Sequence, residues 1–152
     1  MKLALLIAPV LLVGCEQEYE PHMTATLPHH TTHVDDFQDN FLPRVFEAIR
    51  VVETGGCEDP SNAVGADGEL GPFQISRAYF QDAIDHDQGL TGIEYEGVRD
   101  SHISRLIMMA YWDRYAKEWT PEELCRLHNG GPTKRYTDSY WNKCKRWIYP
   151  AE

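Results

Sequence analysis

The chain has 152 residues, of which 42% are hydrophobic and 11% aromatic, a size and composition that suit one compact domain rather than two. Its net charge of −10 excludes a chain-wide basic surface for nucleic acid. No apolar run reaches the roughly 20 residues that a membrane-spanning helix needs, and the CxxC, HExxH and GxGxxG motifs of common zinc and dinucleotide sites are missing. We expect a small acidic monomer without a cofactor.

The first residues predict an export signal. Lys2 supplies a positive charge, the eleven residues 3–13 are apolar but too few to span a membrane, and Gly14-Cys15 follows. This ending resembles the lipobox of bacterial lipoproteins, in which the cysteine is lipidated and becomes the mature N-terminus. We expect residues 1–14 to be removed and the protein to be periplasmic, anchored to the membrane only by lipid on Cys15. An ordinary secretory signal that contains a cysteine is the alternative.

Residues 15–35 predict a flexible tether. They are rich in Glu, Pro, Thr and His and lack apolar periodicity, so they cannot bury enough surface to offset the entropy of ordering. His29, His30 and His33, followed by two aspartates, could chelate a metal ion. A solvated linker explains the same residues, and we predict no metal site.

Hydrophobic periodicity and capping residues predict a mostly helical α+β domain over residues 36–152. Residues 54–72 hold five glycines, two prolines and several Asp, Asn and Ser residues, which predicts turns and a short β-hairpin beside the helices. Five helices are expected: residues 42–52 with Asn40 as N-cap and Pro43 in the first turn, Ser76 to about His86, Ile103 to Tyr111, a fourth starting at Thr120-Pro121, and a last one starting at Thr137.

Glu53 is the most suggestive candidate for chemistry. It directly follows the apolar stripe of the first predicted helix and precedes a glycine-rich turn. A carboxyl group between an apolar core and a turn is partly desolvated, which raises its pKa towards that of a proton donor. A solvated glutamate at a helix end is the alternative.

Five short sequence blocks follow one another over about 100 residues. Together they resemble the invertebrate-type (i-type) lysozymes, the destabilase family, and the Arg-Leu-His-Asn-Gly-Gly-Pro block is the most distinctive of them. The blocks are Val52–Cys57 (Val-Glu-Thr-Gly-Gly-Cys), Gly71–Ile75 (Gly-Pro-Phe-Gln-Ile), Tyr111–Tyr115 (Tyr-Trp-Asp-Arg-Tyr), Arg126–Pro132 and Tyr140–Lys143 (Tyr-Trp-Asn-Lys).

The resemblance implies a lysozyme-like fold and a peptidoglycan-degrading activity. Glu53 would be the general acid that protonates the β-1,4 glycosidic oxygen between N-acetylmuramic acid and N-acetylglucosamine. It also implies that the His128-Asn129 loop lines the sugar cleft, and we expect substrate-binding residues at Gln74, Tyr79, His128 and Asn129. Tyr79, Tyr140 and Trp141 could stack on sugars, although aromatic residues at helical spacing are more often part of a core.

The second carboxylate departs from the family pattern. When the chain is matched to the family without gaps, the position of the catalytic aspartate falls on Val64. The nearest candidate for this carboxylate is Asp67, and Asp59 and Glu69 are the next candidates. An ionised Asp67 would face the developing oxocarbenium ion or an attacking water. The alternative is that Asp67 has no catalytic role and is present because Asp-Gly is a favourable pair in a turn.

Two further functions remain open beside a lysozyme. Residues 62–71 also resemble soluble lytic transglycosylases, which cut the same bond with one glutamate, so Glu53 could work alone. A catalytically inactive lipoprotein that binds glycan strands is the other alternative.

The cysteines also differ from the family, whose members are dense in disulfides. An exported chain is oxidised, so we predict a Cys125–Cys144 bridge between the last two helices, which leaves Cys57 free.

Overall fold

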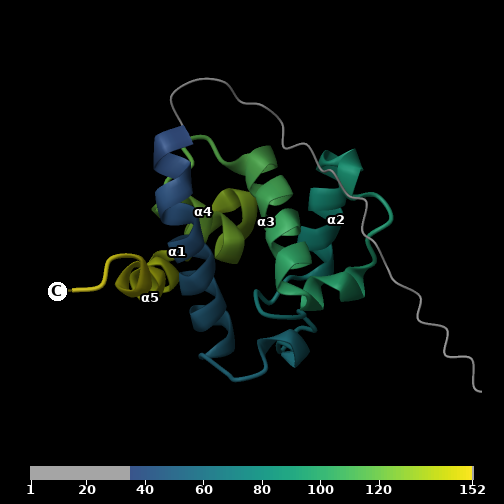
Figure 1. Cartoon of the computed structure of the whole chain (residues 1–152), viewed down its shortest axis with the longest axis horizontal. Coiled ribbons are helices and arrows are strands. Elements are labelled where there is room, and N and C mark those ends of the chain that lie inside the picture. The colour runs from purple at the N-terminus through teal and green to yellow at the C-terminus, as the bar shows by residue number, and fades with distance from the viewer. Residues whose placement is uncertain (1–34, 152) are drawn as a thin grey trace, which may run out of the picture.

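A computed structural model describes residues 35–151, with side chains from Phe41 onward. This part of the chain is mostly helical, as predicted, and none of its helices is long and apolar enough to span a membrane. Five α-helices and four short 3-10 helices follow in the order α1 (Asp35–Thr54), η1 (Pro60–Asn62), α2 (Arg77–His86), η2 (Gln88–Leu90), η3 (Tyr95–Arg99), α3 (Ser101–Tyr115), α4 (Pro121–Gly130), η4 (Gly131–Thr133) and α5 (Asp138–Ile148) (Figure 1).

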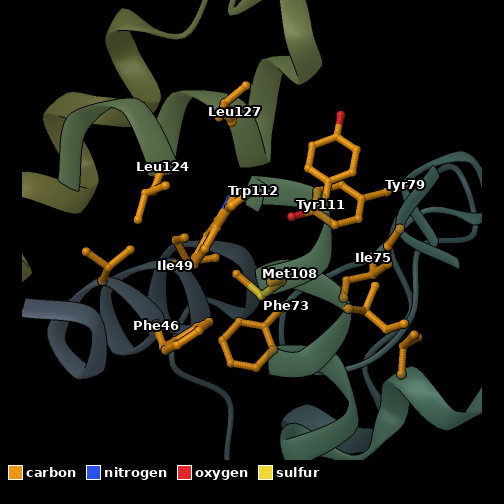
Figure 2. Packing of buried hydrophobic residues seen from close by; sticks show 14 of the residues in the cluster. Phe46, Ile49, Phe73, Ile75, Tyr79, Met108, Tyr111, Trp112, Leu124 and Leu127 are labelled. Atoms are coloured by element: carbon orange, nitrogen blue, oxygen red, sulfur yellow. The ribbon is translucent and has the colours of Figure 1, made fainter. Parts of the chain in front are cut away.

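The helices pack around one core, with α1 against α5 and α4, and α2 against α3 (Figure 1). Phe46 of α1 stacks on Trp112 of α3 at 5.3 Å between ring centroids and meets the edge of Phe73 at 6.0 Å. Figure 2 shows these rings pointing toward one another, with Met108 between the helices. Burial of each such side chain contributes about 1.5–3 kcal/mol. The contacts fix the end of α1 relative to the segment that contains Phe73.

Two of the predicted helix starts are confirmed by their caps. The Ser76 hydroxyl accepts the Tyr79 N–H at 3.2 Å, and the Thr120 hydroxyl accepts the Glu123 N–H at 3.2 Å. Thr137 precedes α5 as predicted, but its hydroxyl donates to the Lys134 carbonyl instead of capping the helix.

The predicted start of the first helix is wrong. α1 begins at Asp35, so Asn40 lies inside the helix rather than at its N-cap, and Pro43 lies well within it. Proline lacks an amide hydrogen, so one backbone hydrogen bond is missing at that turn. The helix nevertheless continues through it, because its following residues are held by the core.

The predicted β-hairpin is also wrong, and within residues 35–151 the fold is helical rather than α+β. Val64–Leu70 and Leu70–Ile75 form isolated antiparallel bridges, and neither extends into a strand. Gly68 and Gly71, with φ of +85° and +76°, reverse the chain within a few residues, so pairing cannot propagate. This compact loop supplies one wall of the cleft described below.

The two buried cysteines correct another prediction. Cys125 of α4 and Cys144 of α5 are both 0% exposed and are free thiols, whereas a disulfide was predicted between them. A hydrogen bond with Cys144 and burial raise the pKa of the Cys125 thiol. Cys57 is free and exposed, as predicted. The packing of α4 on α5 therefore rests on side-chain contacts and not on a covalent bridge.

Gly71 provides a test of how the loop is held. An added Cβ would lie 2.2 Å from the carbonyl oxygen of Val98, and the φ of +76° is unfavourable for alanine. We expect Gly71→Ala to lower the free energy of unfolding by roughly 3 kcal/mol. Gly68→Ala is the matched control, because its φ is +85° but its Cβ would meet nothing within 4 Å, so only the backbone strain of about 1–2 kcal/mol applies. If chemical denaturation shows that both variants lose the same free energy of unfolding, the close approach of Gly71 to Val98 does not stabilise the loop.

Thiol titration tests the cysteines. In a Cys15→Ser protein without reductant, Cys57 should react at once with an aromatic disulfide reagent because it is exposed. Cys125 and Cys144 should react only after denaturant is added, because both are buried. If neither reacts even in denaturant, the two cysteines form the disulfide that the sequence predicted.

Candidate active site

A cleft of about 390 Å³ lies between the end of α1, the glycine-rich loop, α2 and α4. The six catalytic and substrate-binding residues predicted from the sequence all line it, namely Glu53, Asp67, Gln74, Tyr79, His128 and Asn129. The other lining residues are Gly65, Ala66, Glu69 and Ser76. Residues spread over more than 70 positions of the sequence are thus brought to one place.

Glu53 lies in the last turn of α1, with its side chain 20% exposed. The hydroxyl of Tyr140 on α5 donates to its Oε1 at 2.7 Å, and Nε2 of His128 on α4 lies 3.5 Å from the same oxygen. Three helices therefore meet at one carboxyl group, and Glu53 is not the solvated helix end that was the alternative.

His128 connects this carboxyl group to the loop. Its side chain is only 3% exposed, and Nε2 lies 3.0 Å from the carbonyl oxygen of Phe73. A carbonyl oxygen can only accept, so Nε2 carries a hydrogen and donates it. Nδ1 is buried and has no hydrogen-bond partner within the described residues. The His128 ring is therefore held in one orientation by Phe73, with its Nε2–H near Glu53.

The pKa of Glu53 is lowered, contrary to the prediction from sequence. Burial acts to raise this pKa. The hydrogen bond and charge of His128, the hydrogen bond of Tyr140 and the charge of Lys143 act to lower it, and together they outweigh burial. Burial could be inferred from the position of Glu53 in the sequence. The donors come from α4 and α5, whose approach to α1 the sequence pattern does not reveal.

Glu69 ranked behind Asp67 among the predicted candidates for the second carboxylate. Asp67 is exposed at the rim, whereas Glu69 is half-buried and its Oε2 accepts the Asp67 N–H at 3.1 Å. A Cβ at Gly65 would lie 2.2 Å from Oε2 of Glu69 and 2.7 Å from Oε1 of Gln74. The absence of a side chain at Gly65 therefore leaves room for both polar groups. The glycine was the one signal in the sequence that could have indicated polar side chains packed closely at this position.

Gln74 holds an unusual backbone conformation. Its φ is +48°, a left-handed value uncommon outside glycine, and its side-chain amide donates to the Gly71 carbonyl at 2.7 Å. Strained residues of this kind gather at functional sites. The fixed amide presents its oxygen next to Glu69.

None of the three aromatic candidates is an open platform: Tyr79 lines the cleft, whereas Tyr140 and Trp141 do not. Tyr79 is 8% exposed and stacks on Tyr111 with 3.7 Å between ring centroids, and the edge of its ring meets His128. Tyr140 is also 8% exposed, and Trp141 packs partly buried against the core. Asn129, by contrast, is exposed at the rim and is free to contact a ligand.

Some predicted sites lie outside the described residues. These are Cys15, for which lipidation is predicted, and the histidines His29, His30 and His33. Within the part of the chain that carries described side chains, no group of three or more His, Cys, Asp or Glu residues could hold a metal ion.

Comparison with known proteins places this arrangement in a structural family. No family model and no curated protein matches the chain. Its structure is similar to the lysozyme of Meretrix lusoria, solved in complex with Aeromonas hydrophila PliI, with 28% identity, a TM-score of 0.55, and coverage of 68% of this chain and 87% of that chain. It is also similar to Tapes japonica lysozyme, with 20% identity, a TM-score of 0.53, and coverage of 72% and 94%. The resemblance found in the sequence blocks is therefore confirmed: the chain has a mostly helical lysozyme-like fold and is structurally related to the invertebrate-type lysozymes.

Proposed function

We propose that this protein is a glycoside hydrolase that cleaves the β-1,4 bond between N-acetylmuramic acid and N-acetylglucosamine in peptidoglycan, with Glu53 as general acid. The observation that carries the proposal is a half-buried carboxyl group, bonded by Tyr140 and adjoined by His128, on a cleft of a lysozyme-like fold. The cleft volume of about 390 Å³ falls within the range of ligand-binding sites.

The reaction needs a proton donor and a stabiliser of positive charge. Protonated Glu53 transfers its proton to the glycosidic oxygen, and the bond from that oxygen to C1 of the sugar breaks. An ionised carboxylate on the same cleft stabilises the positive charge at C1 or activates a water that attacks it. Asp67 and Glu69 are the carboxylates available for this role. Glu69 is the better placed, because it is half-buried and held by a backbone N–H.

The substrate also determines where the protein works. We propose that the domain acts on peptidoglycan outside the cytoplasm, as the export signal and the lipobox-like Cys15 indicate. In this arrangement residues 15–35 connect the anchor to the catalytic domain and set its reach.

Glu53→Gln tests the general acid. The amide keeps the size of the side chain and still accepts the Tyr140 hydroxyl, but it has no proton to transfer. We expect the clearing of a peptidoglycan suspension to slow by about 10²–10⁴-fold. The matched control is Glu58→Gln, which changes an exposed glutamate five residues away that does not line the cleft and should leave the rate unchanged. A Glu53→Gln variant that keeps a tenth of the activity would rule out the acid role, and an inactive wild type would favour glycan binding alone.

Asp67→Asn and Glu69→Gln identify the second carboxylate. We expect Glu69→Gln to lower kcat by at least about tenfold and Asp67→Asn to lower it less, because Asp67 is exposed and Asn serves a turn equally well. Both variants keep the backbone hydrogen bond from the Asp67 N–H.

The exposure of Asp67 also favours a second candidate function, a lytic transglycosylase that uses Glu53 alone. In that reaction the 6-hydroxyl of the substrate attacks C1, and the products carry anhydro-sugar ends. Mass analysis of the released muropeptides distinguishes the two reactions, because hydrolysis adds a water. Anhydro ends together with full activity of both carboxylate variants would replace the hydrolase by the transglycosylase.

A further inference from the structure

We propose that Tyr140 and His128 act as positioning residues that hold Oε1 of Glu53, so that the proton delivered to the substrate is carried by Oε2. The proposal rests on the general-acid role of Glu53. It specifies which carboxyl oxygen performs that role, and it assigns Tyr140 a task other than sugar stacking.

Both side chains approach the carboxyl group on the same oxygen. The Tyr140 hydroxyl donates to Oε1 at 2.7 Å, and Nε2 of His128, whose hydrogen goes to the Phe73 carbonyl, lies 3.5 Å from it. The hydrogen bond that Glu53 receives within the described residues is made through Oε1 and not through Oε2, and Glu53 lines the cleft. A proton on Oε1 would compete with the Tyr140 hydroxyl hydrogen for that oxygen, whereas a proton on Oε2 leaves the Tyr140 bond in place.

Neither contact is readily lost. The Nε2–H of His128 is fixed by the carbonyl oxygen of Phe73, which can only accept. Burial raises the pKa of Tyr140 well above its usual value, and the Glu53 carboxylate raises it further, so the hydroxyl keeps its proton. Tyr140 is 8% exposed, and its ring is held among core residues of α1, α4 and α5.

Several charged or titratable groups face Glu53 or line the same cleft. His128 comes from α4, Tyr140 and Lys143 from α5, Tyr79 from α2, and Asp67 and Glu69 from the loop. Of these, His128, Tyr140 and Lys143 lower the pKa of Glu53, so the proton leaves at a lower pH than it does from an ordinary glutamate. Since a general acid must be protonated, the activity should fall at a correspondingly lower pH on the alkaline side.

Tyr140→Phe removes the donor but keeps the buried ring. A hydrogen bond to the charged form is lost, so the pKa of Glu53 should rise and the alkaline limb of kcat/KM should move to higher pH. Because the hydroxyl touches Glu53 rather than the substrate, kcat at the optimum should fall roughly tenfold, the loss expected for one orienting hydrogen bond, while KM stays unchanged. Tyr115→Phe is the matched control, since it removes a tyrosine-to-carboxylate bond to Asp82 at 2.9 Å between α3 and α2, away from the cleft.

Carboxyl titration by NMR in glutamate-labelled protein measures the pKa of Glu53 directly, with Glu53→Gln to assign its signal. The pKa should rise in Tyr140→Phe and stay constant in Tyr115→Phe. This readout needs no turnover, so it separates a failure of the positioning role from a failure of the proposed hydrolysis. An unchanged or lowered pKa of Glu53 in a folded Tyr140→Phe protein would overturn the proposal.

Difference infrared spectroscopy identifies the protonated oxygen. If Oε2 carries the proton, Oε1 is the carbonyl oxygen that accepts from Tyr140, and its stretching band should move to higher wavenumber in Tyr140→Phe. If Oε1 carries the proton, the carbonyl oxygen is Oε2 and the band should not move, which would contradict the assignment. Glu53→Gln removes the band and so assigns it.

Discussion

Phe73 lies where the core and the cleft meet, and it constrains both. Its ring is fully buried against Phe46 of α1, while its carbonyl oxygen accepts the Nε2–H of His128 on α4. The same residue therefore sets the distance between two helices and the orientation of the imidazole beside Glu53. Because packing and polar contacts share one residue, the position of the loop cannot change without displacing the groups around the carboxyl. Gly71, two residues earlier, allows the chain to approach Val98 closely enough for this arrangement.

The environment of Glu53 combines two opposing effects. Burial disfavours the charged carboxylate, and the donors on α4 and α5 favour it, with the donors prevailing. A carboxyl group in a purely apolar pocket has a raised pKa, and Glu53 differs because polar hydrogens reach its Oε1. A ligand that filled the cleft would exclude water, and the stronger desolvation would act to raise the pKa of Glu53.

The sequence predicted the helical class, two helix caps and six residues that line one cleft, because periodicity, capping and the family blocks are local signals. Predictions from the sequence failed where contacts between distant parts of the chain determine the structure. The glycine-rich loop has the composition of a hairpin, but positive φ at Gly68 and Gly71 ends the pairing. Tyr140 has the spacing of a core residue, and only the docking of α5 onto α1 directs its hydroxyl to Glu53. Likewise, the two buried cysteines lie on adjoining helices without the bridge that their number suggested.

The bond between Glu53 and Tyr140 joins residues 87 positions apart. Synthesis proceeds from the N-terminus, so the end of α1 is complete long before α5 exists. Until α5 docks, the carboxyl of Glu53 lacks its tyrosine donor and one side of its packing. The environment that lowers the pKa of Glu53 is consequently a property of the finished domain and not of the nascent chain. A chain in which α5 has not yet docked carries the same carboxyl group without its tyrosine hydrogen bond, and that group acquires its final environment only when the last helix is in place.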